Sequence, residues 1–282
     1  MLKNILNDSD HEKFKAQGFL IARGLFSATE IHKLREYIIQ TDFGKGDLFC
    51  DPVIRDVIAD ERLCAIASQL LGETPVYYGD SGVGSGTPPG RWHKDNSQRY
   101  QPEAEDWSED FRIIRFGIYF QDHAEHSGGL AIRAGSHLHA DNTSGKPVYI
   151  DTKPGDIVFW HFRTTHRAST SLLKGLKVPV LNQKIDRYVV PEWLKIPMED
   201  IRMSMFITYA APGPAYERNI DYMATRSAVV AKAKATDYAE SMFAGLDPQR
   251  LVFRDERKRF TSLPEELVHK KHKEFDPAVQ AK

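Results

Sequence analysis

The hydrophobic pattern of the first quarter of the chain predicts helices. Residues 27–30 (SATE) have the capping-box form, and apolar residues follow them at helical spacing, which predicts a helix over about 28–40. A second helix is expected from near Asp60 to Gly72, because its leucines and isoleucines share one face and glycine commonly ends a helix. A short strand is expected at 18–21, before the first helix.

After Pro75 the apolar residues change to the alternation typical of strands. In the clearest strand, 113–120, one face is apolar and expected to pack, and it consists of Ile114, Phe116, Ile118 and Phe120. The other face includes Arg115 and Tyr119 and is expected to line a site. Further strands are predicted at 76–78, 130–133, 148–150, 156–162 and 203–209, and the glycine-rich run 82–90 is predicted to be a loop. Many short strands separated by Gly and Pro predict an antiparallel sandwich or barrel, with helices again from about Ile220.

Composition narrows the class of protein without naming an activity. The chain is 41% hydrophobic and 27% charged, which is ordinary for a globular protein and unlike a disordered or fibrous one. Its 38 Lys and Arg residues nearly balance 39 Asp and Glu residues, giving a net charge of -1. We therefore expect no nucleic-acid partner and no anionic membrane surface as a partner.

Location in the cell is predicted from three features that the sequence lacks. No apolar run is long enough to cross a bilayer, and the first ten residues do not resemble a secretion signal. Cys50 and Cys64 are too few for a disulfide framework and do not form a CxxC pair. A reduced, cytoplasmic location is expected.

His93 and Asp95, in the segment RWHKDNSQ, are the first candidates for chemistry. Residues at i and i+2 of an extended segment project to the same side, so an imidazole and a carboxylate can converge on one ion. If the predicted strand from Asp156 runs beside the segment that carries His93, His166 can complete the set. Two histidines and one carboxylate suit non-haem Fe(II) in oxygenases, because they leave one face of the metal open. An HxD triplet alone is a weak signal in a chain with eleven histidines.

The other histidines have structural explanations. His161 competes with His166 for the third position, but it lies in the apolar run 157–162, where a hydrogen-bonded core histidine is expected. His123 and His126 are assigned to a polar hairpin loop. Zinc-protease, CxxC, Walker and GxSxG motifs are all absent from the sequence.

Five segments follow one another between Phe14 and Tyr209: FKAQGFLIARGLFSATEIHKLREYI, WHKD, SGGLAIRAGSHLH, KPGDIVFWHFRTTHRAS and IRMSMFITYA. In this order they resemble the phytanoyl-CoA dioxygenase (PhyH) family of Fe(II)/2-oxoglutarate oxygenases. The resemblance implies a mainly β fold with flanking helices, a cupin-like jelly roll known as the double-stranded β-helix. It also implies that His93, Asp95 and His166 bind Fe(II) and carry the catalysis.

The resemblance further implies 2-oxoglutarate and O₂ as cosubstrates, and an arginine for the distal carboxylate of 2-oxoglutarate. Arg202, with Ser204 on the same strand face, is the best candidate, and the planar guanidinium suits a carboxylate. Arg202 follows His166 by 36 positions, which is farther than the family pattern. Arg167, Lys174 and Lys177 therefore stay open as substitutes.

We expect a single domain whose parts are N-terminal helices (1–74), a jelly-roll core (75–212), an insertion in that core (about 172–200) and a C-terminal helical extension (213–282). The insertion suits a lid or a contact in a homo-oligomer, and equally a surface elaboration without function.

The expected reaction is hydroxylation of an unactivated C–H bond in a small molecule, with release of succinate and CO₂. Basic residues crowd the metal motifs, which favours an anionic metabolite, natural-product intermediate or acidic sugar, with Arg115, Tyr119 and Arg163 as substrate residues. The basic residues equally suit a solvated rim. The alternatives are a non-catalytic jelly-roll binding protein, a cupin-like isomerase, or an oxygenase of this class that acts on a macromolecule.

Overall fold

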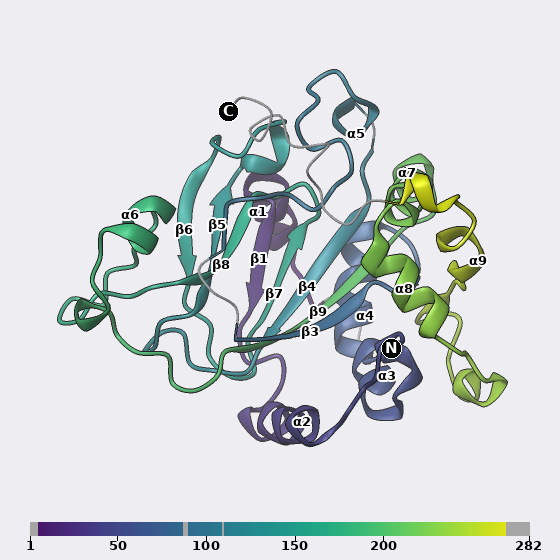
Figure 1. The fold of residues 1–282 in the computed structure, drawn as a ribbon, viewed down its shortest axis with the longest axis horizontal. Helices are drawn as coiled ribbons and strands as arrows, with labels where there is room; N and C mark the ends of the chain where they lie inside the picture. The colour runs from purple at the N-terminus through teal and green to yellow at the C-terminus, as the bar shows by residue number, and fades with distance from the viewer. Residues whose placement is uncertain (1–4, 87–89, 109, 269–282) are drawn as a thin grey trace.

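The computed structural model describes residues 5–86, 90–108 and 110–268 and contains two antiparallel β-sheets with helices at the sides (Figure 1). The strands are β1 (Phe19–Ala22), β2 (Val76–Tyr77), β3 (Ser81–Ser85), β4 (Ile113–Tyr119), β5 (Gly129–Ala134), β6 (Lys146–Ile150), β7 (Ile157–His161), β8 (His166–Thr170), β9 (Met203–Ala210) and β10 (Val252–Phe253). The larger sheet has the order β1-β7-β4-β9-β2-β10, with β3 also paired to β9, and the smaller has the order β6-β5-β8. Among the strands that the structure describes, β10 and β2 are the one parallel pair, and all other neighbours are antiparallel.

The N-terminal helices cover the outer face of the larger sheet. They are α1 (Asp8–Gln17), α2 (Ala28–Gln40), α3 (Pro52–Ile58) and α4 (Glu61–Leu71). Ser27 and Glu30 form the capping box that begins α2, and Gly72 ends α4 in the left-handed conformation that glycine adopts easily. The predicted boundaries of both helices are confirmed to within a residue or two.

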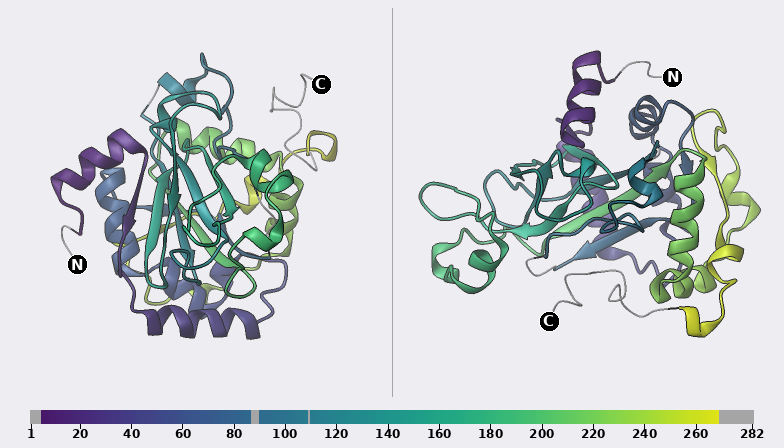
Figure 2. Two further views of the ribbon diagram at one scale, coloured as in Figure 1. Left: turned by 90° about the vertical axis from the view of Figure 1, so that its left-hand side faces the viewer. Right: turned by 90° about the horizontal axis from the view of Figure 1, so that it is seen from above.

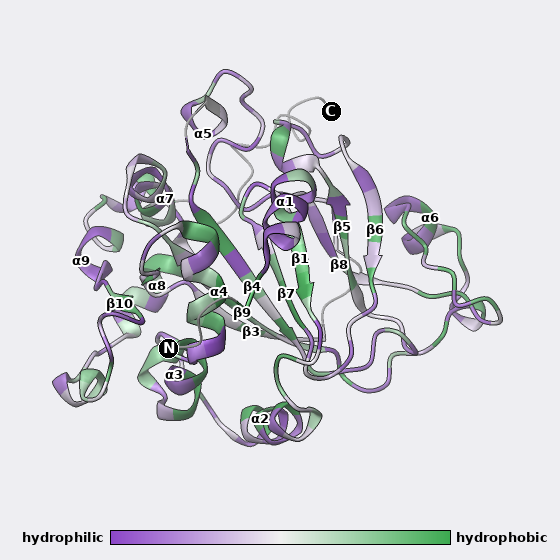
Figure 3. Ribbon diagram, turned by 180° about the vertical axis from the view of Figure 1, so that it is seen from behind, coloured by the Kyte–Doolittle hydropathy of each residue, from purple (hydrophilic) through white to green (hydrophobic). Residues whose placement is uncertain are grey.

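The alternation of β4 sorts its side chains between two cores. Ile114, Phe116 and Ile118 pack outward with the apolar faces of the N-terminal helices. Tyr119, on the opposite face, packs between the sheets with Trp160 of β7 and residues of the smaller sheet. Figure 3 shows that β1, which pairs with β7 at the edge of the larger sheet, is hydrophobic along its length. One face of β4 therefore holds the helices, and the other faces the interior of the jelly roll.

The remaining helices are α5 (Glu105–Ser108), α6 (Gln183–Tyr188), α7 (Pro214–Ala224), α8 (Ser227–Ala235) and α9 (Arg257–Phe260). Helices α7, α8 and α9 lie together at one end of the molecule, and α6 lies at the other end, beyond β6 (Figures 1 and 2). Helix α6 belongs to the segment between β8 and β9, which is the expected insertion.

Two expectations about strands differ from the structure. The prediction of a loop over 82–90 is wrong for its first part, because Ser81–Ser85 forms β3 and pairs with β9. Glycine has little intrinsic preference for strands, so the sequence carried no signal of this pairing. Strand β8 was not predicted. Strands β1 and β10 pair with the larger sheet although they lie outside residues 75–212, the expected bounds of the jelly-roll core.

Candidate metal centre

Backbone hydrogen bonds bring the HxD segment to the start of β8. The amide of His93 donates to the carbonyl of His166 at 3.0 Å, and the amide of His166 donates back at 2.9 Å. The amide of Asp95 donates to the carbonyl of Phe162, just beyond β7, at 3.3 Å. Segments more than 60 residues apart in the chain are therefore joined through their backbones, and this sets the positions of all three side chains.

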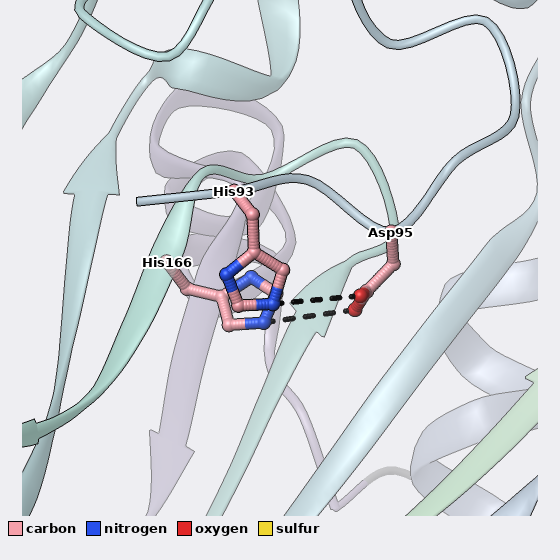
Figure 4. A group of neighbouring side chains, drawn as sticks. All are labelled: His93, Asp95 and His166. Carbon is pink, nitrogen blue, oxygen red and sulfur yellow. Dashed lines mark ion pairs between the residues drawn. The ribbon is translucent and has the colours of Figure 1, made fainter. Parts of the chain in front are cut away.

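The three side chains converge on one point (Figure 4). Nε2 of His93 lies 3.9 Å from Oδ1 of Asp95, and Nε2 of His166 lies 3.7 Å from Oδ2 of the same carboxylate. One ligand atom from each residue can be chosen so that all lie within 4.8 Å of one another. Since metal–ligand bonds of this kind are about 2 Å long, one divalent ion fits among the three atoms.

The second nitrogen of each histidine orients its ring. Nδ1 of His93 lies 2.9 Å from the carbonyl oxygen of Arg91, and Nδ1 of His166 lies 3.0 Å from that of Thr164. A carbonyl only accepts, so each Nδ1 carries the proton and each Nε2 keeps a lone pair for a metal. Burial, with the neighbouring His93, lowers the pKa of His166 to about 4, so this ring is neutral near pH 7.

Asp95 presents a charged carboxylate to the same point. Burial by itself would raise the pKa of Asp95, but Arg115, His166 and His93 hold it well below its usual value. Two imidazoles and one carboxylate on one side of an ion form the donor set that non-haem Fe(II) takes in oxygenases. The residues present therefore fit an iron ion.

His161 lies away from this cluster. Its Nδ1 accepts from the amide of Arg163 at 3.2 Å, and its ring lies 5.4 Å from those of Phe111 and His137. Burial, with the charge of Arg163, lowers the pKa of His161 well below its usual value, so it is neutral. These contacts agree with the expected core histidine.

His123 and His126 also lie outside the cluster, after β4. Nδ1 of His123 shares a hydrogen bond of 3.0 Å with the hydroxyl of Thr152. Nδ1 of His126 is buried without a partner among the described residues. Neither joins the three convergent side chains in the part of the chain that the structure describes.

Arg202 is a buried cation with an unused donor. It is 2% exposed, its Nε donates to the carbonyl of Gly128 at 2.7 Å, and its Nη1 donates to the hydroxyl of Ser204 at 3.2 Å. No carboxylate pairs with it, and its Nη2 has no partner, among the residues that the structure describes. A buried, uncompensated guanidinium is costly unless an anion binds it, so this site fits the carboxylate of a small molecule.

Tyr119 lies beside Arg202. The guanidinium carbon is 5.7 Å from the centre of the tyrosine ring, and the Tyr119 hydroxyl is buried without a partner in the described part of the chain. Tyr119 was predicted as a substrate residue. It lies beside Arg202, the arginine expected to bind 2-oxoglutarate.

Arg115 and Arg163 have partners within the protein. Arg115 donates to Asp80 at 2.6 Å and to Asp95 at 3.1 Å. Arg163 donates to the backbone carbonyl of Asp106 and lies over the ring of Trp107. Asp80 is the residue at this site that sequence reasoning missed, because nothing in its local sequence distinguishes it from a solvated carboxylate.

The three substitutes for Arg202 lie in different surroundings. Arg167 forms a fully buried ion pair with Asp186 at 2.9 Å. Lys177 pairs with Glu125 at the surface. Lys174 lines a cavity of about 540 Å³ between the insertion and the jelly roll, whose walls include Ile196 and Met198.

That cavity adjoins Arg202 through two glycines. Gly128, whose carbonyl holds Nε of Arg202, lines the cavity, and so does Gly86, whose amide donates to the Arg202 carbonyl. A Cβ atom built on Gly128 would lie 3.5 Å from both the Arg202 side chain and Met198. The insertion therefore forms one wall of a space that begins beside the buried cation.

This architecture, a jelly roll with helices against one sheet, defines the class: a cupin-like fold shared with 2-oxoglutarate-dependent oxygenases. The predicted fold class is confirmed. Residues 37–172 match the family model described as Phytanoyl-CoA dioxygenase (PhyH). No curated protein matches the sequence significantly.

Three solved structures illustrate the shared fold. EctD from S. alaskensis, with 2-oxoglutarate and 5-hydroxyectoine, has a TM-score of 0.54 and 17% identity over 75% of this chain and 79% of its own. HygX from Streptomyces hygroscopicus, with nickel and 2-oxoglutarate, has a TM-score of 0.53 and 14% identity over 73% and 86%. SnoK, a non-heme α-ketoglutarate-dependent carbocyclase from nogalamycin biosynthesis, has a TM-score of 0.50 and 18% identity over 73% and 84%.

The described residues contain no helix that is both long and apolar enough to cross a membrane.

Proposed function

We propose that this protein is an Fe(II)/2-oxoglutarate-dependent dioxygenase that hydroxylates a small molecule. The observation that carries the proposal is the convergence of His93, Asp95 and His166, with both Nε2 atoms within 4 Å of the carboxylate. The match of residues 37–172 to the PhyH family model supports the same assignment. In this proposal the three residues hold the iron.

Bound iron, with 2-oxoglutarate and O₂, would supply the oxidising power for C–H hydroxylation, with succinate and CO₂ as the products from the cosubstrate. The protein's part is to hold and orient the reactants. The backbone carbonyls of Arg91 and Thr164 orient the two imidazoles, so that both Nε2 atoms lie on the side of the Asp95 carboxylate, where the iron would be held. Trp160, 5.2 Å from the His166 ring, packs against this side of the site and helps to exclude water.

Arg202 and Ser204 would bind the distal carboxylate of 2-oxoglutarate. The unpartnered Nη2 of Arg202 can donate to one carboxylate oxygen, and Ser204 already fixes Nη1 at 3.2 Å. Arg202 directly precedes β9, and Ser204 is its second residue. Thr208, later in the same strand, contacts Arg115 beside the metal ligands. The other end of the dicarboxylate is proposed to lie at the metal.

Asp95 supports hydroxylation as the outcome. Its carboxylate would occupy one coordination position of the iron, so a halide could not take that position. Asp95 therefore favours hydroxylation, or a desaturation or cyclisation, over halogenation, and hydroxylation is the outcome that we propose.

The substrate is proposed to be a small anionic metabolite, natural-product intermediate or acidic sugar. The cavity of about 540 Å³ lies within the size range of small-molecule sites and contains Lys174, which pairs with no carboxylate among the described residues. Arg91 is a second such cation. It is exposed, lies two positions before His93, and forms no ion pair among the described residues. Lys94, Arg115 and Arg163 are held by internal partners and lend the substrate assignment no support.

The insertion supports a homo-oligomer. Several of its large apolar side chains are exposed, among them Leu176 (84%), Tyr188 (73%) and Trp193 (70%). Exposed apolar side chains that gather into a patch commonly mark protein interfaces, and these residues all belong to one segment.

We also propose that residues 1–282 act as one domain, because one core joins the N-terminal helices, the larger sheet and Leu251.

The decisive experiment is anaerobic addition of Fe(II) and 2-oxoglutarate to the metal-free protein. We expect a weak visible charge-transfer band that is absent from His166→Ala. Folded wild-type protein that shows no such band would overturn the proposal. A panel of metabolites, scored by substrate-stimulated succinate release, then tests the substrate class, and Lys174→Met should weaken the response to an anionic substrate.

A further inference from the structure

Arg115 makes a contact through each of its three guanidinium nitrogen atoms. Nη1 donates to Oδ2 of Asp95 at 3.1 Å, Nη2 donates to Oδ2 of Asp80 at 2.6 Å, and Nε donates to the hydroxyl of Thr208 at 3.0 Å. Its side chain is only 18% exposed. A guanidinium held in this way has a fixed plane and a fixed direction toward Asp95.

These partners are carried by the larger sheet. Arg115 lies in β4 directly opposite Thr208 of β9, and the amide of Thr208 donates to the carbonyl of Asp80 at 2.9 Å. The ring of Phe162 covers the guanidinium, with its centre 4.9 Å from the central carbon. The carbonyl of Phe162 also accepts from the amide of Asp95. A rigid sheet therefore determines where the Arg115 charge lies.

Asp95, by contrast, lies outside any regular strand. The carbonyl of Phe162 holds the backbone amide of Asp95. Among the described residues, the side chain that donates a hydrogen bond to the Asp95 carboxylate is Arg115. A ligand on an irregular segment needs such a contact, because metal affinity depends on how ligands are oriented before the ion arrives.

Charge balance explains the second carboxylate. Alone, Arg115 would neutralise Asp95 and weaken the attraction of that carboxylate for a cation. Asp80 lies closer to the guanidinium than Asp95 does, 2.6 Å against 3.1 Å. The three side chains Asp80, Arg115 and Asp95 together carry one net negative charge, and this charge stays available to the metal.

We propose that Arg115 is a positioning residue that holds Asp95 for the metal ion, and that Asp80 is its counter-ion. This inference rests on the proposed function, since it takes His93, Asp95 and His166 as the ligands. It assigns to Arg115 a role through Asp95, where the sequence alone suggested contact with the substrate.

The test measures binding of Mn²⁺ alone to the metal-free protein, from the loss of the free-ion electron paramagnetic resonance signal. Arg115→Met should weaken Mn²⁺ binding by about 10- to 100-fold, the usual effect of removing a group that orients a ligand. Arg115→Lys should fall between Arg115→Met and the wild type, because one ammonium cannot bridge two carboxylates in the same geometry. Asp80→Asn should also weaken binding, because the Arg115 charge then acts on Asp95 alone.

Arg112→Met is the matched control. Arg112 precedes β4 and pairs with Glu73 and Asp110 away from the three ligands, so its loss should leave Mn²⁺ affinity unchanged. Thermal unfolding of the metal-free variants separates a change in affinity from a loss of folded protein. If Arg115→Met does not fold, Arg115→Lys and Asp80→Asn decide the question.

The inference would be overturned if folded Arg115→Met bound Mn²⁺ within twofold of the wild type. The same conclusion would follow if Arg115→Lys and Asp80→Asn both did so. If His166→Ala abolishes Mn²⁺ binding in that same experiment, the proposed function stands while the role of Arg115 fails. Wild-type protein that binds no Mn²⁺ would overturn both.

Discussion

Arg167 and Asp186 form an ion pair of 2.9 Å in which both side chains are completely buried. Arg167 lies in β8, directly after His166, and Asp186 lies in α6 of the insertion. Asp186 also accepts from the amide of Ser171, and Lys195 of the insertion lies 3.9 Å from it. The insertion is therefore anchored to the strand that carries a proposed metal ligand.

Replacement of Arg167 by Met should destabilise the protein strongly. Removing one partner of a buried ion pair leaves the other charge without compensation, which costs about 3–5 kcal/mol. We expect a fall of that size in the free energy of unfolding measured by urea titration. Lys15→Met, which breaks the exposed pair with Glu12, should cost less than about 1 kcal/mol. Similar losses in the two variants would show that the buried pair does not anchor the insertion.

Replacement of Arg202 by Met should weaken binding of 2-oxoglutarate. A hydrogen bond to a charged group contributes about 1.5–3 kcal/mol, which corresponds to a rise of roughly 10- to 150-fold in the KM for 2-oxoglutarate. The measurement is succinate formation at varied 2-oxoglutarate concentration. Lys177→Met serves as the control, because Lys177 lies nearer to His166 in the chain but pairs with Glu125. A rise in this KM in Lys177→Met and not in Arg202→Met would identify Lys177 as the residue that binds the distal carboxylate.

Metal binding should distinguish His166 from His161. His166→Ala removes one of three convergent ligand atoms, so its content of tightly bound iron after reconstitution should fall at least tenfold. His161→Ala removes a ring that contacts Phe111 and His137, so it should retain iron and lose only stability. Iron content by elemental analysis after gel filtration gives the answer. Loss of iron in His161→Ala alone would place the metal elsewhere.

Stability should depend on pH through Glu30 at the start of α2. Hydrogen bonds from Arg62 and from the Ser27 backbone and hydroxyl lower the pKa of Glu30 from 4.5 to about 2. A lowered folded-state pKa means that the contribution is complete above pH 5 and disappears as pH falls from about 4.5 toward 2. Glu30→Gln should therefore cost up to about 1 kcal/mol near pH 7, the usual size of a capping effect at an exposed site. Urea titrations at pH 7 and pH 3 should show a smaller difference at pH 3, and a constant difference would contradict this assignment.

Local sequence was enough to predict the elements whose signals lie within one turn or one strand. Ser27 and Glu30 begin a helix through contacts three residues apart, and Gly72 ends one through its own backbone conformation. The alternation at Ile114, Phe116 and Ile118 predicted which face of β4 is buried, and the structure places the N-terminal helices against it. His93 and Asp95 were predicted as neighbours because their spacing alone brings them to one side of an extended segment.

The sequence by itself determined these local elements and, through the order of its motifs, the resemblance to the PhyH family. Only the tertiary structure decided that Gly82 and Gly84 lie in a strand, since their pairing energy comes from β9 and not from glycine itself. It also decided that Arg115 contacts Asp80 and Asp95, residues 35 and 20 positions away. A long-range ion pair leaves no periodic trace in a chain, because its partners are brought together by sheet register, and register is set by all the strands at once.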